Sequence, residues 1–179
     1  KDLLFYQADL RSKELVSQRM EVIQAVAAGE KATVITSFDA FMDTLLPKDV
    51  IVEKTVRIAN DSTFHLEEMQ SRLVALGYDR EVQIEAPGQF AVRGGILDVY
   101  PLTEELPIRI ELWGDEVDSI RTFDVETQRS IENLEEVSIC PAVEFPQEGE
   151  KGVSFLDYFP MEETILFLDE PVRLIEKGQ

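Results

Sequence analysis

The sequence predicts a protein of mixed α/β and α+β character, in which an α+β domain with an antiparallel sheet is inserted between partial α/β segments. Residues 1–47 follow a strand, helix, strand, helix order, and residues 48–146 place a helix before a run of strands. Residues 147–179 form the return segment of the α/β part, and they contain an apolar run at residues 164–168 that predicts a buried strand. Helices that alternate with strands are typical of parallel sheets, whereas a helix followed by several strands is typical of α+β domains.

The first segment contains two predicted strands and two predicted helices. Residues 3–6 are a short apolar run that predicts a buried strand, and residues 13–28 have the apolar spacing of one helical face. The β-branched run in residues 31–37 predicts a covered parallel strand, and residues 39–46 predict a brief helix. We expect another part of the chain to complete this sheet.

The inserted domain begins with a predicted strand over residues 50–58. A helix capped by Ser62 or Thr63 is then expected to run to about Leu76, where Gly77 stops it. The strands that we expect afterwards cover residues 82–85, 90–93, 108–113, 116–124 and 137–140. A tight Gly114-Asp115 link predicts a hairpin, Gly94-Gly95 permits a bulge or bend, and residues 132–136 are expected to be a charged exit.

Strand alternation predicts a water-facing surface on this sheet. In residues 108–113 the alternation turns Arg109, Glu111 and Trp113 away from the core. In the strand over residues 90–93 it turns Ala91 and Arg93 outward. Arginine and tryptophan are enriched at binding hot spots because each offers a large, stiff contact area with a directed polar or planar group. The pattern therefore favours a binding surface, although single exposed arginine and tryptophan side chains also occur as ordinary solvated residues.

The composition restricts the partners and the compartment that we expect. Seventeen Lys and Arg against 36 Asp and Glu give a formal charge of −19, which disfavours phosphate backbones as a partner of these residues. The single cysteine, Cys140, excludes an internal disulfide and fits a reducing compartment. No secretory signal and no long apolar run is present in these residues, so we expect a cytoplasmic protein without a membrane partner.

Candidate chemistry is sparse. An apolar run over residues 164–168 that ends in Asp169 and Glu170 has the form of a degenerate Walker-B-like element, but Pro171 follows and no phosphate-binding loop occurs in these residues. His65 lacks the second ligand that a zinc site needs, and Cys140 has no basic neighbour that would activate it. We expect no catalytic residue, metal or cofactor here, and the pattern favours a binding module.

Two motifs carry a resemblance to a known family. The segments GQFAVRGGILDVYP and PIRIELWGDEVDSIRTFDVETQRSIE closely resemble the UvrB-homology module of bacterial transcription-repair coupling factors, and the likeness extends from DLLFYQAD to FLDEP. UvrB proteins share the first segment and the RIELWGDEVDSI-like part, but FDVETQRSIE resembles the coupling factors. The long aromatic hairpin that UvrB inserts into damaged DNA has no counterpart here, because FYQAD runs almost directly into RSKELVSQRM.

The resemblance implies a role in recruitment rather than a reaction. In the family, the inserted domain binds UvrA, and the flanking helicase-like segments, similar to domain 1 of UvrB, have lost ATP hydrolysis. By motif match the UvrA-contacting positions fall on Arg93, Arg109 and Trp113, with Trp113 at a position that is commonly Phe in relatives. ATP and Mg²⁺, DNA and RNA polymerase would belong to other regions of a longer parent protein that resembles a DNA translocase.

Two alternatives stay open at this point. The chain could belong to a UvrB-type enzyme that verifies DNA damage with ATP, which a phosphate loop upstream would favour. The sheet surface could also be a dock for another part of the full protein, which would hide it until a partner arrives.

Overall fold

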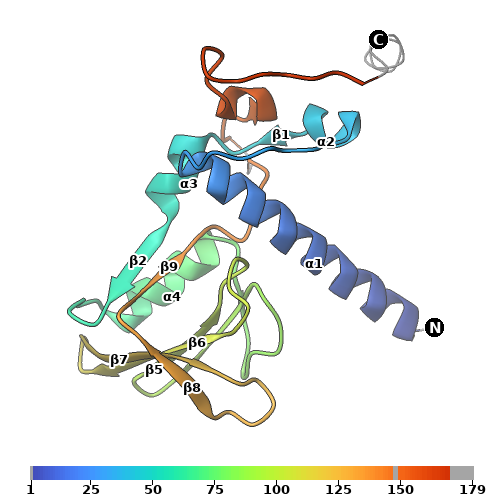
Figure 1. Ribbon diagram of the computed structural model, residues 1–179. Coiled ribbons are helices and arrows are strands. Elements are labelled where there is room, and N and C mark those ends of the chain that lie inside the picture. Colours follow the sequence, from blue (N-terminus) through green and yellow to red (C-terminus); the bar gives the residue numbers. More distant parts are fainter. Residues whose placement is uncertain (1, 147–148, 170–179) are drawn as a thin grey trace.

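The computed structural model describes residues 2–146 and 149–169, with side chains from Leu15 onward, and it confirms a mixed α+β protein with antiparallel sheets. Within these residues the largest sheet has six strands in the order β3-β4-β5-β6-β7-β8 (Figure 1). Its strands are β3 (Asp79–Arg80), β4 (Gln89–Arg93), β5 (Ile96–Tyr100), β6 (Ile108–Trp113), β7 (Glu116–Phe123) and β8 (Ser130–Leu134). The pair β3–β4 is parallel, and the other neighbours are antiparallel.

One face of this sheet carries the larger core. The helix α4 (Leu66–Ala75) and a separate antiparallel ribbon of β2 (Val56–Ala59) and β9 (Glu136–Ile139) pack against it. Met69 and Leu73 from α4 meet the inward side chains of β4 to β7, among them Phe90, which is fully buried. The core side of the sheet is thereby covered by α4 and the ribbon of β2 and β9.

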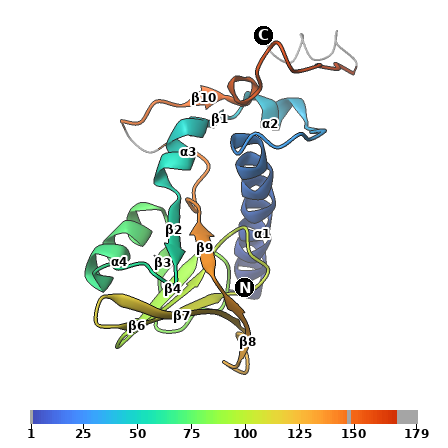
Figure 2. The same ribbon diagram turned by 60° about the vertical axis from the view of Figure 1, so that its left-hand side comes forward.

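The flanking elements form a second core above the sheet (Figure 2). They are α1 (Asp2–Ala27), α2 (Phe38–Met42), α3 (Lys48–Lys54) and a 3-10 helix η1 (Phe155–Tyr158), with a two-residue pairing of β1 (Thr44–Leu45) and β10 (Val153–Ser154). Met20 from α1, Ile51 from α3 and Tyr158 from η1 are buried together in this cluster. No described helix is long and apolar enough to cross a membrane.

A partly buried group of ion pairs joins the two parts. Arg19 on α1 donates from Nε to Oε2 of Glu144 at 2.6 Å and from Nη2 to Oδ2 of Asp43 at 2.8 Å. Glu144 lies in the segment after β9 and is 4% exposed. A buried carboxylate needs such a partner, so this contact joins α1 to the segment that follows β9.

The predicted strands of the flanking segments are wrong. Residues 3–6 belong to α1, residues 31–37 have no regular structure, and residues 164–168 are an irregular and exposed stretch. Ile35 is 94% exposed and Phe167 is 87% exposed. A strand buried on both faces needs hydrogen-bonded neighbours on both edges, and the described residues provide none for these runs.

Within the inserted domain the predicted strand boundaries need corrections. Residues 48–54 form α3 with Pro47 as its N-cap, and the strand begins only at Val56. The helix α4 starts at Leu66 with His65 as its N-cap, later than Ser62 or Thr63. The run at residues 82–85 is a loop, with pairing at β3 instead, and the expected charged exit overlaps β8. The Gly114-Asp115 hairpin and the helix stop at Gly77 are confirmed.

Gly77 is the glycine with the clearest structural need. Its φ is +90°, and a Cβ built there would lie 2.6 Å from Cγ1 of Val143, whereas Gly94 has φ +61° and no atom within 4 Å. We expect Gly77→Ala to lower the free energy of unfolding by about 2 kcal/mol and Gly94→Ala by about 1 kcal/mol, since only the first adds a collision to the backbone strain. Urea denaturation of both variants measures the difference, and equal losses would contradict the close contact with Val143.

Candidate functional site

The outer face of the sheet is the side of β4 to β7 that turns away from α4. Its side chains follow from the strand register, which pairs Asp98 with both Ala91 and Arg109, and Ile96 with both Arg93 and Glu111. Residues that pair across antiparallel strands share a face. The predicted outward positions of Arg93, Arg109 and Ala91 are therefore correct in direction, and Asp98 lies between the two arginines.

Ala91 and Arg109 differ from the prediction in their exposure. Ala91 is buried, with 1% exposed, because Ile84 from the loop before β4 and Phe123 from β7 form a small second core on the outer face. The side chain of Arg109 is 13% exposed, whereas that of Arg93 is 45% exposed. Alternation gives the direction of a side chain, but it does not show which loops cover that side.

Asp98 holds both arginines. Its Oδ1 accepts from Nε of Arg109 at 2.7 Å, and its Oδ2 accepts from Nη2 of Arg109 at 2.9 Å and from Nη2 of Arg93 at 2.7 Å. The Asp98 side chain is 2% exposed. A carboxylate this deeply buried needs a charged partner, and the two-pronged contact with Arg109 provides it. The hydrogen bonds that Arg109 donates to Asp98 raise the pKa of Arg109, so this guanidinium stays charged.

Arg109 is fixed by further contacts on its other sides. Its guanidinium carbon lies 4.2 Å from the ring centre of Phe123, and Nη2 also donates to Oε1 of Gln128 at 2.9 Å. Nη1 donates to the main-chain oxygen of Gln128 at 3.4 Å. Gln128 has φ +60°, a left-handed conformation that the loop between β7 and β8 imposes and that is uncommon for a residue with a side chain. This strain fits a residue that is held in place to support Arg109.

The two arginines have different numbers of donors left for a partner. A guanidinium has five N–H groups, and the described contacts of Arg109 occupy four of them, leaving one. Arg93 donates one hydrogen bond, from Nη2 to Oδ2 of Asp98, so four of its N–H donors remain for a partner. Arg93 is therefore the more available cation on the outer face, and Arg109 is mainly a structural member of it.

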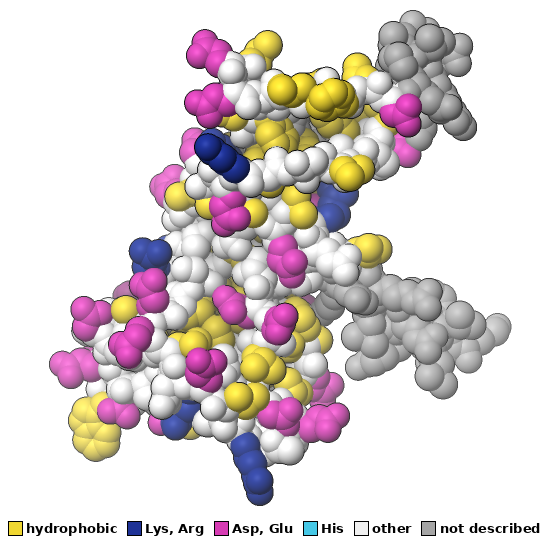
Figure 3. Space-filling model, viewed as in Figure 1, with side chains coloured by type: hydrophobic (Ala, Val, Ile, Leu, Met, Phe, Trp, Pro, Cys, Tyr) yellow, Lys and Arg dark blue, Asp and Glu magenta, His cyan; other side chains and the backbone are white. Residues whose placement is uncertain are grey.

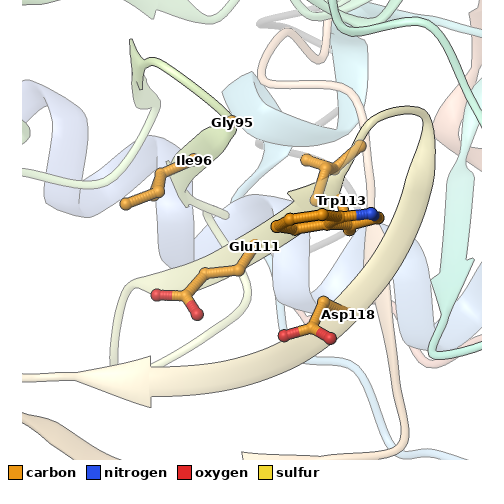
Figure 4. A pocket seen from close by; sticks show the side chains of 6 residues that line it. Gly95, Ile96, Glu111, Trp113 and Asp118 are labelled. Carbon is orange, nitrogen blue, oxygen red and sulfur yellow. The ribbon is translucent and has the colours of Figure 1, made fainter.

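Trp113 lies at the end of β6 and is 82% exposed. Its indole borders a shallow hollow of about 280 Å³ that is also lined by Ile96, Glu111 and Asp118 (Figure 4). The register of β6 and β7 shifts after Glu111, so Asp118 is an extra residue that turns toward the hollow. Such an exposed indole is available to bury against another surface.

Sequence reasoning missed Asp98 and Gln128 as members of this site, whereas strand alternation had already placed Glu111 on the outer face. Glu111 pairs with Arg121 on the neighbouring strand, and Oε2 of Glu111 accepts from Ser119 at 3.4 Å. Asp98 had a usable signal, because it is the single charged residue in the apolar run Ile96–Tyr100. Gln128 had no such signal in the sequence, because its contacts with Arg109 depend on the path of the loop between β7 and β8.

The other predicted candidates lie apart from the outer face. Asp169 is exposed and follows an irregular stretch, and Glu170 lies outside the described residues. Cys140 is buried, and this burial raises the pKa of its thiol, as expected for a structural cysteine. No group of three or more metal-ligating side chains that could hold an ion occurs among the described residues. Acidic side chains are spread over the face seen in Figure 3.

His65, the only histidine of the sequence, is the N-cap of α4, and its Nδ1 donates to Oδ2 of Asp115 at 2.9 Å. This hydrogen bond with Asp115 raises the pKa of His65 above its usual 6.5. Because the folded pKa is raised, the stabilising contribution is full below the unfolded value and is lost as pH rises through the folded pKa. We expect Asp115→Asn to lower the pKa of His65 measured by NMR, and Glu68→Gln to lower it less. An unchanged value in Asp115→Asn would contradict the pairing.

Comparison with known proteins gives a consistent result. A family model described as the UvrB interaction domain matches residues 56–145, just over half of the chain. The transcription-repair-coupling factor of Bacillus subtilis is 39% identical over 159 residues, which are 87% of this chain and 14% of that protein. The protein of the same name from Staphylococcus aureus is 36% identical over 174 residues, or 96% of this chain and 14% of that protein.

The chain thus spans about 14% of the length of these curated relatives. The matched range contains β2 to β9 and α4, and with them Arg93, Asp98, Arg109 and Trp113. The chain therefore belongs to the family of UvrB interaction domains, and it is similar to the part of transcription-repair-coupling factors that contains this domain.

Proposed function

We propose that the outer face of the sheet binds UvrA, and that the chain thereby recruits UvrA to a stalled RNA polymerase for transcription-coupled nucleotide excision repair. The observation that carries the proposal is the 82% exposed Trp113 on the same sheet face as a half-exposed arginine, Arg93. Both lie inside the range of the UvrB interaction domain. Exposed tryptophan and arginine are the side chains that most often dominate binding energy at protein interfaces.

The mechanism of binding follows from the geometry of this face. Arg93 donates to a carboxylate or carbonyl oxygen of UvrA with the N–H groups that Asp98 leaves free. Trp113 buries its indole, which removes apolar surface from water. Arg109 supports this face through its contacts with Asp98 and Phe123. Its one remaining N–H can donate at most one hydrogen bond to the partner.

The parent protein supplies the remaining steps of this proposal. The curated relatives are about seven times longer than this match, and we place the contacts with RNA polymerase and DNA, and an ATP- and Mg²⁺-dependent translocase, in their other regions. The present residues then act as an interaction module without a reaction of their own. In this arrangement the motor stays on the DNA while this module presents its outer face to UvrA.

The test is a titration of purified UvrA against the wild-type chain and Arg93→Ala by isothermal calorimetry. We expect roughly a tenfold loss of affinity, since a charge-assisted contact is removed from a partly exposed site. Arg72→Ala, on the exposed side of α4 and away from the outer face, is the matched control and should bind as the wild type does. A wild-type chain that does not bind UvrA, or equal affinities for all three proteins, would refute the proposal for this face.

A further inference from the structure

We propose that Asp98 is a positioning residue for partner binding, which holds Arg93 in the orientation that an acceptor group of the partner meets. This inference rests on the proposed binding of UvrA at the outer face. Asp98 is 2% exposed, so it contacts the partner through no atom of its own and must act through the arginines. It lies on the middle one of the three strands that carry this group.

The direction of Arg93 follows from the strand register. Arg93 on β4 pairs with Ile96, whereas Asp98 is two residues further along β5, so the guanidinium reaches Asp98 diagonally across the sheet. Diagonal neighbours in an antiparallel pair lie within reach of long side chains. The contact fixes one end of the guanidinium against the sheet, and the 45% exposed remainder faces water.

Arg109 makes this arrangement possible. Its two contacts with Asp98 neutralise the buried carboxylate, so the two arginines and Asp98 together retain one net positive charge. That charge resides on Arg93, because Arg109 is 13% exposed and surrounded by Asp98, Phe123 and Gln128. The group therefore suits one acceptor of the partner, a carboxylate or a main-chain carbonyl, at Arg93.

Fixing an arginine before binding has an energetic consequence. A free arginine loses rotamer freedom when a partner immobilises it, and this loss opposes binding. An arginine that is already held by Asp98 loses less, and its planar donors point in one direction. Asp98 thus raises the affinity without touching the partner, and this predicts that its effect disappears when Arg93 is absent.

The experiment is a double-mutant cycle with Asp98→Asn and Arg93→Gln, titrated against UvrA. Asparagine keeps the shape of Asp98 but is neutral and has one acceptor oxygen in place of two, so it cannot accept all three N–H groups that Asp98 receives from Arg93 and Arg109. We expect Asp98→Asn to lower the affinity roughly 5-fold when Arg93 is present and less than about 2-fold when Arg93→Gln is present. A residue that only stabilises the fold would give the same factor in both backgrounds.

Folding is followed by circular dichroism and thermal unfolding for every variant. If Asp98→Asn does not fold, the same cycle is measured in an Arg109→Met background, which removes the buried cation that asparagine leaves poorly paired. Equal factors in the two backgrounds, or an increase in affinity, would overturn the positioning role. Trp113→Ala separates the two hypotheses: if it weakens UvrA binding while the cycle shows no coupling, only the positioning role fails, and if the wild type does not bind, both fail.

Discussion

Replacing Trp113 with alanine is expected to lower the affinity for UvrA on the order of 100-fold, the largest effect of any single truncation on the outer face. The indole is 82% exposed in the free chain, so its full area is available for burial by a partner. For the same reason its loss should change the free energy of unfolding by less than about 0.5 kcal/mol. Calorimetric titration and urea denaturation of the same preparation measure both quantities.

Two controls make the Trp113 result specific. Trp113→Phe keeps an aromatic ring and should retain most of the affinity, because stacking and apolar burial persist. Ile35→Ala removes a 94% exposed apolar side chain from the flanking segment and should leave the affinity unchanged. A loss in Ile35→Ala equal to that in Trp113→Ala would show a non-specific apolar contact, and wild-type affinity in Trp113→Ala would remove the indole from the interface.

Arg109→Ala is expected to lower the free energy of unfolding by about 3 kcal/mol, because it leaves the Asp98 carboxylate buried with Arg93 as its remaining cation. The change also removes the guanidinium that lies 4.2 Å from the Phe123 ring centre and its contacts with Gln128. Arg93→Ala should cost less than about 1 kcal/mol, since its side chain is 45% exposed and its ion pair is partly screened by water.

Urea denaturation of the two arginine variants provides the comparison. If Arg109→Ala is as stable as Arg93→Ala, the buried pair contributes no more than the partly exposed one, and the account of Arg109 as a structural member is wrong. A change in the urea dependence rather than in the midpoint would indicate a change in the unfolded state instead. An Arg109→Lys variant keeps the charge but loses the two-pronged contact, so we expect an intermediate loss.

Part of the six-stranded sheet could be predicted because its signals are local. Strand alternation in residues 108–113 and the Gly114-Asp115 turn determine which side chains share a face, and both are confirmed. The direction of Arg93 and Arg109 followed from the same rule. The exposure of the outer-face side chains could not be predicted in this way. Ile84 and Gln128, which cover part of this face, come from loops, and the path of a loop has no periodic signal in the sequence.

The flanking segments show the opposite case. Residues 31–37 and 164–168 have the composition of buried strands, but a strand forms only where neighbours satisfy its backbone N–H and C=O groups. Such neighbours are not found among the described residues. The apolar run at residues 3–6 instead continues the helix that follows it, where each backbone group is paired within the helix. Propensity alone therefore does not separate these outcomes.

Trp113 is the only tryptophan of the sequence, and it borders the hollow that Ile96, Glu111 and Asp118 also line. Selective excitation of indole in the isolated chain therefore reports on one known position, without a dye or a label. Its emission in the free chain should resemble that of a hydrated indole, and transfer to a drier surrounding should shift the spectrum toward shorter wavelengths. The intrinsic fluorescence of Trp113 therefore reports whether a partner occupies the outer face.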